Sequence, residues 1–202
     1  MNTTDSIPTA IDESATVVVR REIRIQAPID LVWRLRTDAA GWPAWQTDVD
    51  SAEVDGPLVP GASFRWSTHG LDVTSTVYAV DAPRRILWGG GAQGITGIHE
   101  WTFTPDDDAT IVRTAESWEV EPVHAEAEHL RTALDGSLAS WLQLLRTKAE
   151  AKAANRARKV RRRRVAKGLA WTSLGLTALF VLAEPWLLVP LVLFLVALSL
   201  WD

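Results

Sequence analysis

Residues 97–119 read GIHEWTFTPDDDATIVRTAESWE, and this stretch decides the fold class. Two segments of alternating apolar and polar residues flank a short turn rich in aspartate, which is typical of an antiparallel hairpin. Placing the turn within the three consecutive aspartates puts Phe103 opposite Val112, so that the apolar faces stay together. The same register predicts that His99 faces Glu116 on the neighbouring strand.

The alternation of this hairpin recurs along the chain, with glycine, proline and aspartate between the segments. Short spacings and tight turns indicate one antiparallel meander. In the first segment Arg21 interrupts the apolar face, which indicates either a bulge or strand edge or a charge directed into the interior. The predicted strands are residues 16–26, 62–68, 71–80, 85–88, 94–103 and 110–118, with a turn at 89–91.

The glycines at positions 89, 91 and 94 satisfy the spacing GxGxxG of dinucleotide-binding loops. Such a loop must open a helix, whereas a strand pattern follows here. We therefore interpret these glycines as part of a hairpin, and we expect no cofactor.

Two helical regions frame the strands. The first begins at Pro28, with an apolar stripe that Gly41 and Pro43 interrupt, and its stripe consists of Ile29, Val32, Trp33 and Leu35. The second follows Pro122 and continues without a helix breaker through Lys167, with apolar residues at steps of three and four: Ala127, Leu130, Leu134, Leu138, Trp141, Leu142 and Leu145. Because the sheet is the one apolar surface available, we expect the second helix to cover it.

Charge divides the chain into three parts. Residues 1–150 contain 12 Lys and Arg against 23 Asp and Glu, whereas residues 151–167 contain 9 basic residues and no acidic one. The absence of cysteine excludes disulfides and thiolate metal sites. Residues 1–15 have neither a basic start nor an apolar run, so we expect a disordered leader and no signal peptide.

The tail at residues 168–201, GLAWTSLGLTALFVLAEPWLLVPLVLFLVALSLW, contains Glu184 as its single charged side chain. A straight helix of that length would span about 51 Å, more than the roughly 30 Å of a hydrocarbon core. Proline favours a turn at the residue before it, and a carboxylate avoids the bilayer centre. We therefore predict a membrane anchor over residues 168–202, a transmembrane helical hairpin turning at 183–186. A single tilted span and an interfacial or buried helix pair are the alternatives.

The basic neck at residues 151–167 precedes this tail directly. Short basic flanks stay on the cytoplasmic side of a membrane, which predicts a cell-membrane protein with its N-terminal domain in the cytoplasm. The run Arg156 to Lys167 also suits contact with anionic lipid headgroups. Because the run has no interleaved aromatic residues and its position already explains it, we expect no nucleic-acid partner.

Four stretches of residues 16–150 carry a resemblance to a known family: IRIQAPIDLVWRLRTDAAGWPAWQTDV, DGPLVPGASFRW, DAPRRILWGG and GIHEWTFTPDDDATIVRTAESWE. They resemble the polyketide cyclase/dehydrase and lipid-transport branch of the START/Bet v 1-like (SRPBCC) superfamily. The resemblance implies an α+β helix-grip fold, a curved antiparallel sheet wrapped around a long C-terminal helix. It also implies a cavity between sheet and helix for a lipid or another hydrophobic small molecule.

Alternation and helical spacing select the side chains expected to line that cavity, although a plain aromatic core explains many of them equally well. The expected ligand-binding residues are Phe64, Trp66, Val73, Ser75, Val77, Trp88, His99, Trp101, Phe103, Glu116, Leu130, Leu134 and Leu138. A histidine–carboxylate pair in an apolar cavity is suited to acid/base chemistry, so His99 and Glu116 are the catalytic candidates. The simpler interpretation of the pair is an internal contact that fixes the sheet.

Three functions follow from these features. Membrane-tethered binding or transfer of a hydrophobic small molecule or lipid is favoured. The alternatives are a cyclase/dehydrase-type enzyme acting on a polyketide-like or aromatic substrate, and an accessory protein that docks to a membrane partner.

We expect no metal site, because His124 and His129 have the wrong spacing for two ligands on one helix face.

Overall fold

The hairpin of residues 97–119 forms in the predicted register. In the computed structural model, strands β6 (Ile95–Asp106) and β7 (Ala109–Val120) pair antiparallel, with Phe103 opposite Val112 and His99 opposite Glu116. The model describes residues 7–120 and 127–199, with side chains as far as residue 164. The observed register confirms the predicted pairing. This register forms because a shift by one residue would move the apolar side chains to the opposite face of the sheet.

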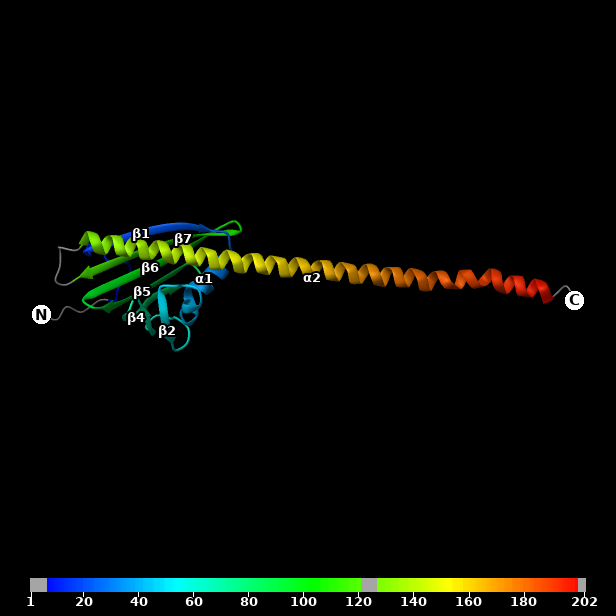
Figure 1. Cartoon of the computed structure of the whole chain (residues 1–202), viewed down its shortest axis with the longest axis horizontal. Coiled ribbons are helices and arrows are strands. Elements are labelled where there is room, and N and C mark those ends of the chain that lie inside the picture. The colour runs from blue at the N-terminus through cyan, green and yellow to red at the C-terminus, as the bar shows by residue number, and fades with distance from the viewer. Residues whose placement is uncertain (1–6, 121–126, 200–202) are drawn as a thin grey trace. The chain divides into compact units, whose positions relative to one another are not determined.

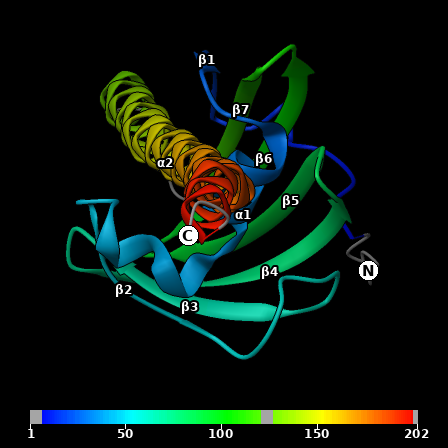
Figure 2. The same ribbon diagram turned by 90° about the vertical axis from the view of Figure 1, so that its right-hand side faces the viewer.

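Seven antiparallel strands form one sheet in the order β1-β7-β6-β5-β4-β3-β2. Figure 2 shows this sheet curving around the first part of helix α2, and Figure 1 shows the strands from the side. Strands β2 to β7 form a meander in sequence order, and β1 pairs with β7 at its far side. The remaining strands are β1 (Val17–Ile25), β2 (Val49–Val54), β3 (Ser63–Thr68), β4 (Leu71–Asp81) and β5 (Arg85–Ala92).

Strand β5 corrects the turn predicted at residues 89–91. All three glycines belong to the strand, and the turn to β6 lies at Gln93 and Gly94. A Cβ atom on Gly90 would lie 2.2 Å from the Thr74 carbonyl oxygen on β4. Glycine is therefore required here for the close approach of two strands, which a pattern of glycines alone does not distinguish from a loop.

Strand β2 was not predicted. Its sequence, VDSAEV, is short and alternates weakly, and the strand lies at the edge of the sheet beside β3. Val49 is its one fully buried residue and three of its six residues are exposed, so its apolar pattern is weak.

The first helical region forms as expected. Helix α1 (Ile29–Thr37) follows Pro28, and a 3-10 helix, η1 (Ala39–Ala44), contains the Gly41 and Pro43 that interrupt the apolar stripe. The buried side chains of α1 include the expected Val32 and Leu35, and also Arg36.

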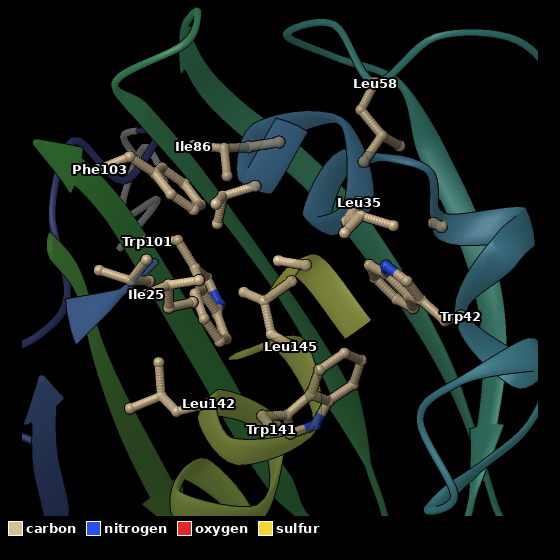
Figure 3. Packing of buried hydrophobic residues seen from close by; sticks show 14 of the residues in the cluster. Ile25, Leu35, Trp42, Leu58, Ile86, Trp101, Phe103, Trp141, Leu142 and Leu145 are labelled. Atoms are coloured by element: carbon tan, nitrogen blue, oxygen red, sulfur yellow. The ribbon is translucent and has the colours of Figure 1, made fainter. Parts of the chain in front are cut away.

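Helix α2 (Ala127–Ser199) provides the second half of the core. Leu134 and Leu138 pack against Val17 and Val19 of β1. The next two turns of α2 contribute Trp141, Leu142, Leu145 and Ala149 to the larger hydrophobic core. Figure 3 shows Trp141 and Leu145 among side chains of the sheet and of α1. The predicted stripe therefore covers the sheet.

Arg21 and the leader both lie at the β1 edge of the sheet. The β1–β7 register has no bulge, and the exposed guanidinium of Arg21 forms a bidentate ion pair with Asp135 of α2. This outcome matches the strand-edge interpretation. Ile11 is buried, and the backbone N–H of Asp12 donates to Ser117 Oγ at 3.0 Å. The expected disorder therefore does not extend over residues 7–15, while residues 1–6 lie outside the described part.

The chain divides into two units, residues 1–154 and residues 155–202. The backbone of α2 is helical through 183–186 to Ser199, so the turn predicted there is not formed and no transmembrane hairpin is seen. Proline disfavours helix at the preceding residue without excluding it. Within the residues described with side chains, 7–120 and 127–164, no helix is long and apolar enough to cross a membrane.

Candidate functional site

A cavity of about 270 Å³ lies between the inner face of the sheet and α2. Strands β3 to β7 form its floor, and Ala133, Ser137 and Trp141 of α2 close it from the other side. Gly89, Gly90 and Gly97 line it without side chains, which keeps part of the floor open. Because the exposed His69 also lines it, the cavity reaches the surface at the turn between β3 and β4.

The residues expected to line a cavity fall into two groups. Those that line the observed cavity are Trp66, Val73, Ser75, Trp88, His99 and Glu116. Those that pack into the surrounding hydrophobic clusters instead are Phe64, Val77, Trp101, Phe103, Leu130, Leu134 and Leu138. The residues of the second group pack around the cavity without lining it. A binding role for each residue of both groups stays a prediction.

His99 and Glu116 meet inside the cavity. His99 Nδ1 lies 3.1 Å from Glu116 Oε2, and the two side chains are 10% and 17% exposed. His99 Nε2 lies 2.7 Å from Thr114 Oγ1, which itself donates to the Glu100 carbonyl oxygen. Since the threonine hydrogen is used in that bond, Nε2 carries the imidazole hydrogen and Nδ1 presents a lone pair to Glu116.

The protonation of this pair follows from its surroundings. Burial lowers the pKa of His99 well below its usual value, and the positive charge of Arg36 lowers it further. Burial raises the pKa of Glu116 to about 7, against the opposing effects of a hydrogen bond from Trp118 Nε1 at 2.7 Å and of Arg36. A neutral imidazole beside a protonated carboxyl group is therefore the favoured state below neutral pH.

Arg36 extends from α1 into the cavity wall and is only 1% exposed. Its Cζ atom lies 4.2–4.6 Å from the ring centres of four tryptophans, namely Trp42, Trp88, Trp101 and Trp141. Its Nε and Nη1 atoms have no hydrogen-bond partner among the residues that the structure describes. Aromatic faces stabilise a cation but do not replace the directional acceptors that guanidinium N–H groups require.

Comparison with known families identifies the chain. Residues 16–150 match the model of the family described as polyketide cyclase / dehydrase and lipid transport. The chain belongs to this family. The match covers the strands, both helical regions of the domain and the cavity, and it ends before the basic neck. The comparison with curated proteins gives no match.

Solved structures similar to this chain share the fold. A hypothetical protein from Helicobacter pylori aligns with a TM-score of 0.62 at 21% identity, over 74% of this chain and 99% of its own. A START superfamily protein from Mycobacterium smegmatis gives 0.58 at 14% identity, over 66% and 97%. A Streptomyces aromatase/cyclase gives 0.59 at 20% identity, over 66% and 93%. At these identities the comparison establishes the helix-grip fold of this polyketide cyclase family member and no more.

Sequence reasoning missed Arg36, the most buried charged side chain of the site. Its signal was present, because Arg36 follows Ile29 and Val32 at helical spacing and therefore falls on the apolar stripe of α1. It also missed Trp118, which donates to Glu116, and the glycines of the floor. A charged residue on an apolar stripe is a sign of a cavity or of a buried pair.

No group of three metal-binding side chains occurs among the residues that the structure describes. His129 is exposed, and His124 lies outside the described residues. The titratable or charged groups of the cavity lining are one guanidinium, two imidazoles and one carboxyl, beside three hydroxyl side chains and a wall of aromatic rings. Such a site can hold the apolar part of a small molecule and form hydrogen bonds with a polar group at one end of that molecule.

Proposed function

We propose that this protein binds a hydrophobic small molecule or lipid in the cavity between the sheet and α2, and that it exchanges this ligand with a membrane to which its C-terminal segment is attached. The observation that supports binding is the cavity of about 270 Å³ inside a domain of this family. Its size is close to the lower end of known small-molecule sites, which begin at about 300 Å³.

The lining favours an apolar ligand with one polar end. Trp66, Val73 and Ile95 supply apolar surface. Arg36, His99 and Glu116 supply groups able to hydrogen-bond to a polar end. Indole rings give large contact areas with little loss of side-chain freedom. A ligand of this kind would place its apolar body along the tryptophans and its polar end at the guanidinium.

The attachment to a membrane rests on the sequence of residues 156–202. Residues 156–164 are exposed and include four consecutive arginines, Arg161 to Arg164, next to the apolar tail. Basic residues beside an apolar segment attract anionic lipids by about 1 kcal/mol each and remain on the cytoplasmic side. We propose a tail that inserts as one tilted span, because the α2 backbone has no turn at 183–186.

The ligand is tested by extracting the purified full chain with organic solvent and identifying the released molecules by mass spectrometry. The proposal predicts one hydrophobic compound class in near-stoichiometric amount. Protein that carries no such compound, and that takes up none from mixed lipid vesicles, would contradict it.

The attachment is tested by vesicle flotation of the full chain. We expect flotation with vesicles containing phosphatidylserine even at about 1 M salt, which screens the charges of the basic neck, whereas a variant ending at residue 167 should stay behind at that salt concentration. Replacing Arg161 to Arg164 with glutamine should weaken the dependence on anionic lipid. The attachment is wrong if the shortened chain floats as well as the complete one.

An enzyme is the second candidate, favoured by one observation, the 3.1 Å contact between His99 and Glu116 inside the cavity. A carboxyl group with a pKa of about 7 can both donate and accept a proton near neutral pH. If the protein promotes cyclisation or loss of water from a polyketide-like substrate, His99→Gln should abolish turnover while ligand occupancy persists. Unchanged turnover in that variant would exclude the pair from catalysis.

A further inference from the structure

The cavity contains a buried cation whose hydrogen-bonding groups are not used. Arg36 is 1% exposed and is part of the cavity lining. Within the described part of the chain, its Nε and Nη1 atoms have no hydrogen-bond partner. Buried polar groups in native proteins are almost always paired, so an unpaired pair of donors at a cavity requires an explanation. A bound ligand oxygen is one, and an ordered water molecule is another.

The four tryptophan rings explain how the cation is tolerated but leave its donors unpaired. The rings of Trp42, Trp88, Trp101 and Trp141 each lie within 4.6 Å of Cζ. They exclude water from the faces of the guanidinium, which strengthens any electrostatic contact made at its edge. Arginine is also the residue whose planar donors match a carboxylate or phosphate in two parallel hydrogen bonds.

The remaining charges of the cavity decide whether Arg36 already has a counter-ion. The titratable or charged side chains in the lining are Arg36 from α1, His69 from the β3–β4 turn, His99 from β6 and Glu116 from β7. When Glu116 is ionised it offsets the charge of Arg36. When Glu116 carries a proton, the neutral pair with His99 leaves Arg36 as an uncompensated cation at the cavity.

From this geometry we propose that the ligand bears an anionic oxygen group, that Arg36 binds this group, and that Glu116 takes up one proton when the ligand enters. The proposal rests on the proposed function and adds the chemical class of the ligand's polar end. Ligand anion and ionised Glu116 would compete for the same cation and repel each other, so protonation of Glu116 accompanies binding.

The test compares two probes of equal shape, 2-naphthoate and its neutral amide 2-naphthamide, by isothermal titration calorimetry. The full chain is held in nanodiscs of zwitterionic lipid, and empty nanodiscs serve as the blank. At pH 6 we expect the acid to bind at least tenfold more tightly than the amide. Arg36→Met should remove this preference, whereas Arg34→Met, at an exposed position of the same helix, should keep it.

Proton uptake is tested by repeating the titration from pH 6 to pH 8, where the probe remains ionised. If Glu116 with its pKa of about 7 must be protonated, affinity for the acid falls about tenfold over this range while affinity for the amide stays constant. At pH 8, where Glu116 is ionised before the ligand enters, titrations in buffers of different ionisation enthalpy count the proton directly. Glu116→Gln should remove the pH dependence, and His69→Asn should retain it.

The outcomes separate this inference from the proposed function. Equal affinities for acid and amide, or an acid preference that survives Arg36→Met, overturn the inference while leaving a hydrophobic binding site intact. Binding of neither probe overturns the inference, and it also contradicts the proposed function if no hydrophobic compound is extracted from the protein. Acid binding that depends on Arg36 but not on pH rejects the part assigned to Glu116.

Discussion

His99 Nδ1 and Glu116 Oε2 lie 3.1 Å apart on directly opposed residues of β6 and β7. The pair holds one proton in both states, on the histidine in the unfolded chain and on the glutamate in the folded protein. Just below pH 6.5 an unfolded chain has a protonated histidine and an ionised carboxylate, whereas the folded pair has the neutral imidazole and the protonated carboxyl. The proton count is the same, so this pair contributes no slope to stability in that range.

Glu116→Gln should expose the titration of His99 alone. Its folded pKa is lowered, so the stability linked to it is present above pH 6.5 and is lost as the pH falls. We expect the variant to lose stability on acidification from pH 6.5 to 5 relative to the wild type, measured by urea unfolding at each pH. Parallel stability curves of variant and wild type over that range would contradict the assignment.

His99→Gln should show the opposite slope. The pKa of Glu116 is raised from 4.5 to about 7, so the stability linked to it is present below pH 4.5 and is lost as the pH rises to about 7. The whole effect is about 3 kcal/mol, from the free energy of one pKa unit. Urea unfolding of this variant from pH 4.5 to 7.5 measures it, and a curve rising with pH would reject it.

Arg36→Met should not destabilise the protein. Removing the buried guanidinium relieves a desolvation cost of several kcal/mol, whereas desolvated cation–π contacts supply about 2 kcal/mol or more. We expect a gain on the order of 1 kcal/mol in the free energy of unfolding, measured at pH 6, where Glu116 is protonated and is not left as an unpaired charge. Arg34→Met, an exposed change on the same helix, is the control.

A clear loss of stability in Arg36→Met alone would instead assign the arginine a structural role. Its contacts with the tryptophan rings would then explain why Arg36 is buried, and the proposal that Arg36 binds an anionic ligand would lose its main support. A gain or no change is what a residue retained for binding should show, because functional sites often reduce stability.

Leu138→Ala should destabilise the attachment of α2 to β1. Leu138 is fully buried against Val17 and Val19, and removing such a side chain costs about 2–5 kcal/mol. Urea unfolding measures the loss, with the exposed Gln143→Ala as the matched change on the same helix. A loss below about 1 kcal/mol would mean that α2 is not held at this point.

The sequence predicted those parts of the fold in which a local pattern and the tertiary structure agree. The β6–β7 register followed from alternation around one turn, and the stripe from Leu134 to Leu145 followed from helical spacing. Strand β2 was missed because it is short and three of its six residues are exposed, which leaves little apolar pattern. The three glycines of β5 were predicted as a turn because the approach of Gly90 to the Thr74 carbonyl depends on a partner strand.

The site was predicted less completely than the fold. Trp66, Ser75, His99 and Glu116 were expected on the cavity wall from alternation, whereas Arg36 was not, since an arginine in a helix is normally solvated. Trp101 and Phe103 share the alternation of His99 but lie in packed clusters, and alternation alone does not tell a cavity wall from a core. Whether a residue of the sheet lines the cavity or belongs to the core depends on which side chain of α1, η1 or α2 packs against it.

The proposed ligand lies in the cavity between the sheet and α2, so filling this cavity should displace it. Ser137→Leu adds an apolar side chain at a residue that lines the cavity, whereas Ala139→Leu adds the same side chain at an exposed position of the same helix. Native mass spectrometry of the two full-length variants and the wild type measures occupancy. Ser137→Leu should lose the co-purifying ligand, whereas Ala139→Leu should keep it. Equal ligand occupancy in both variants would show that the ligand does not occupy this cavity.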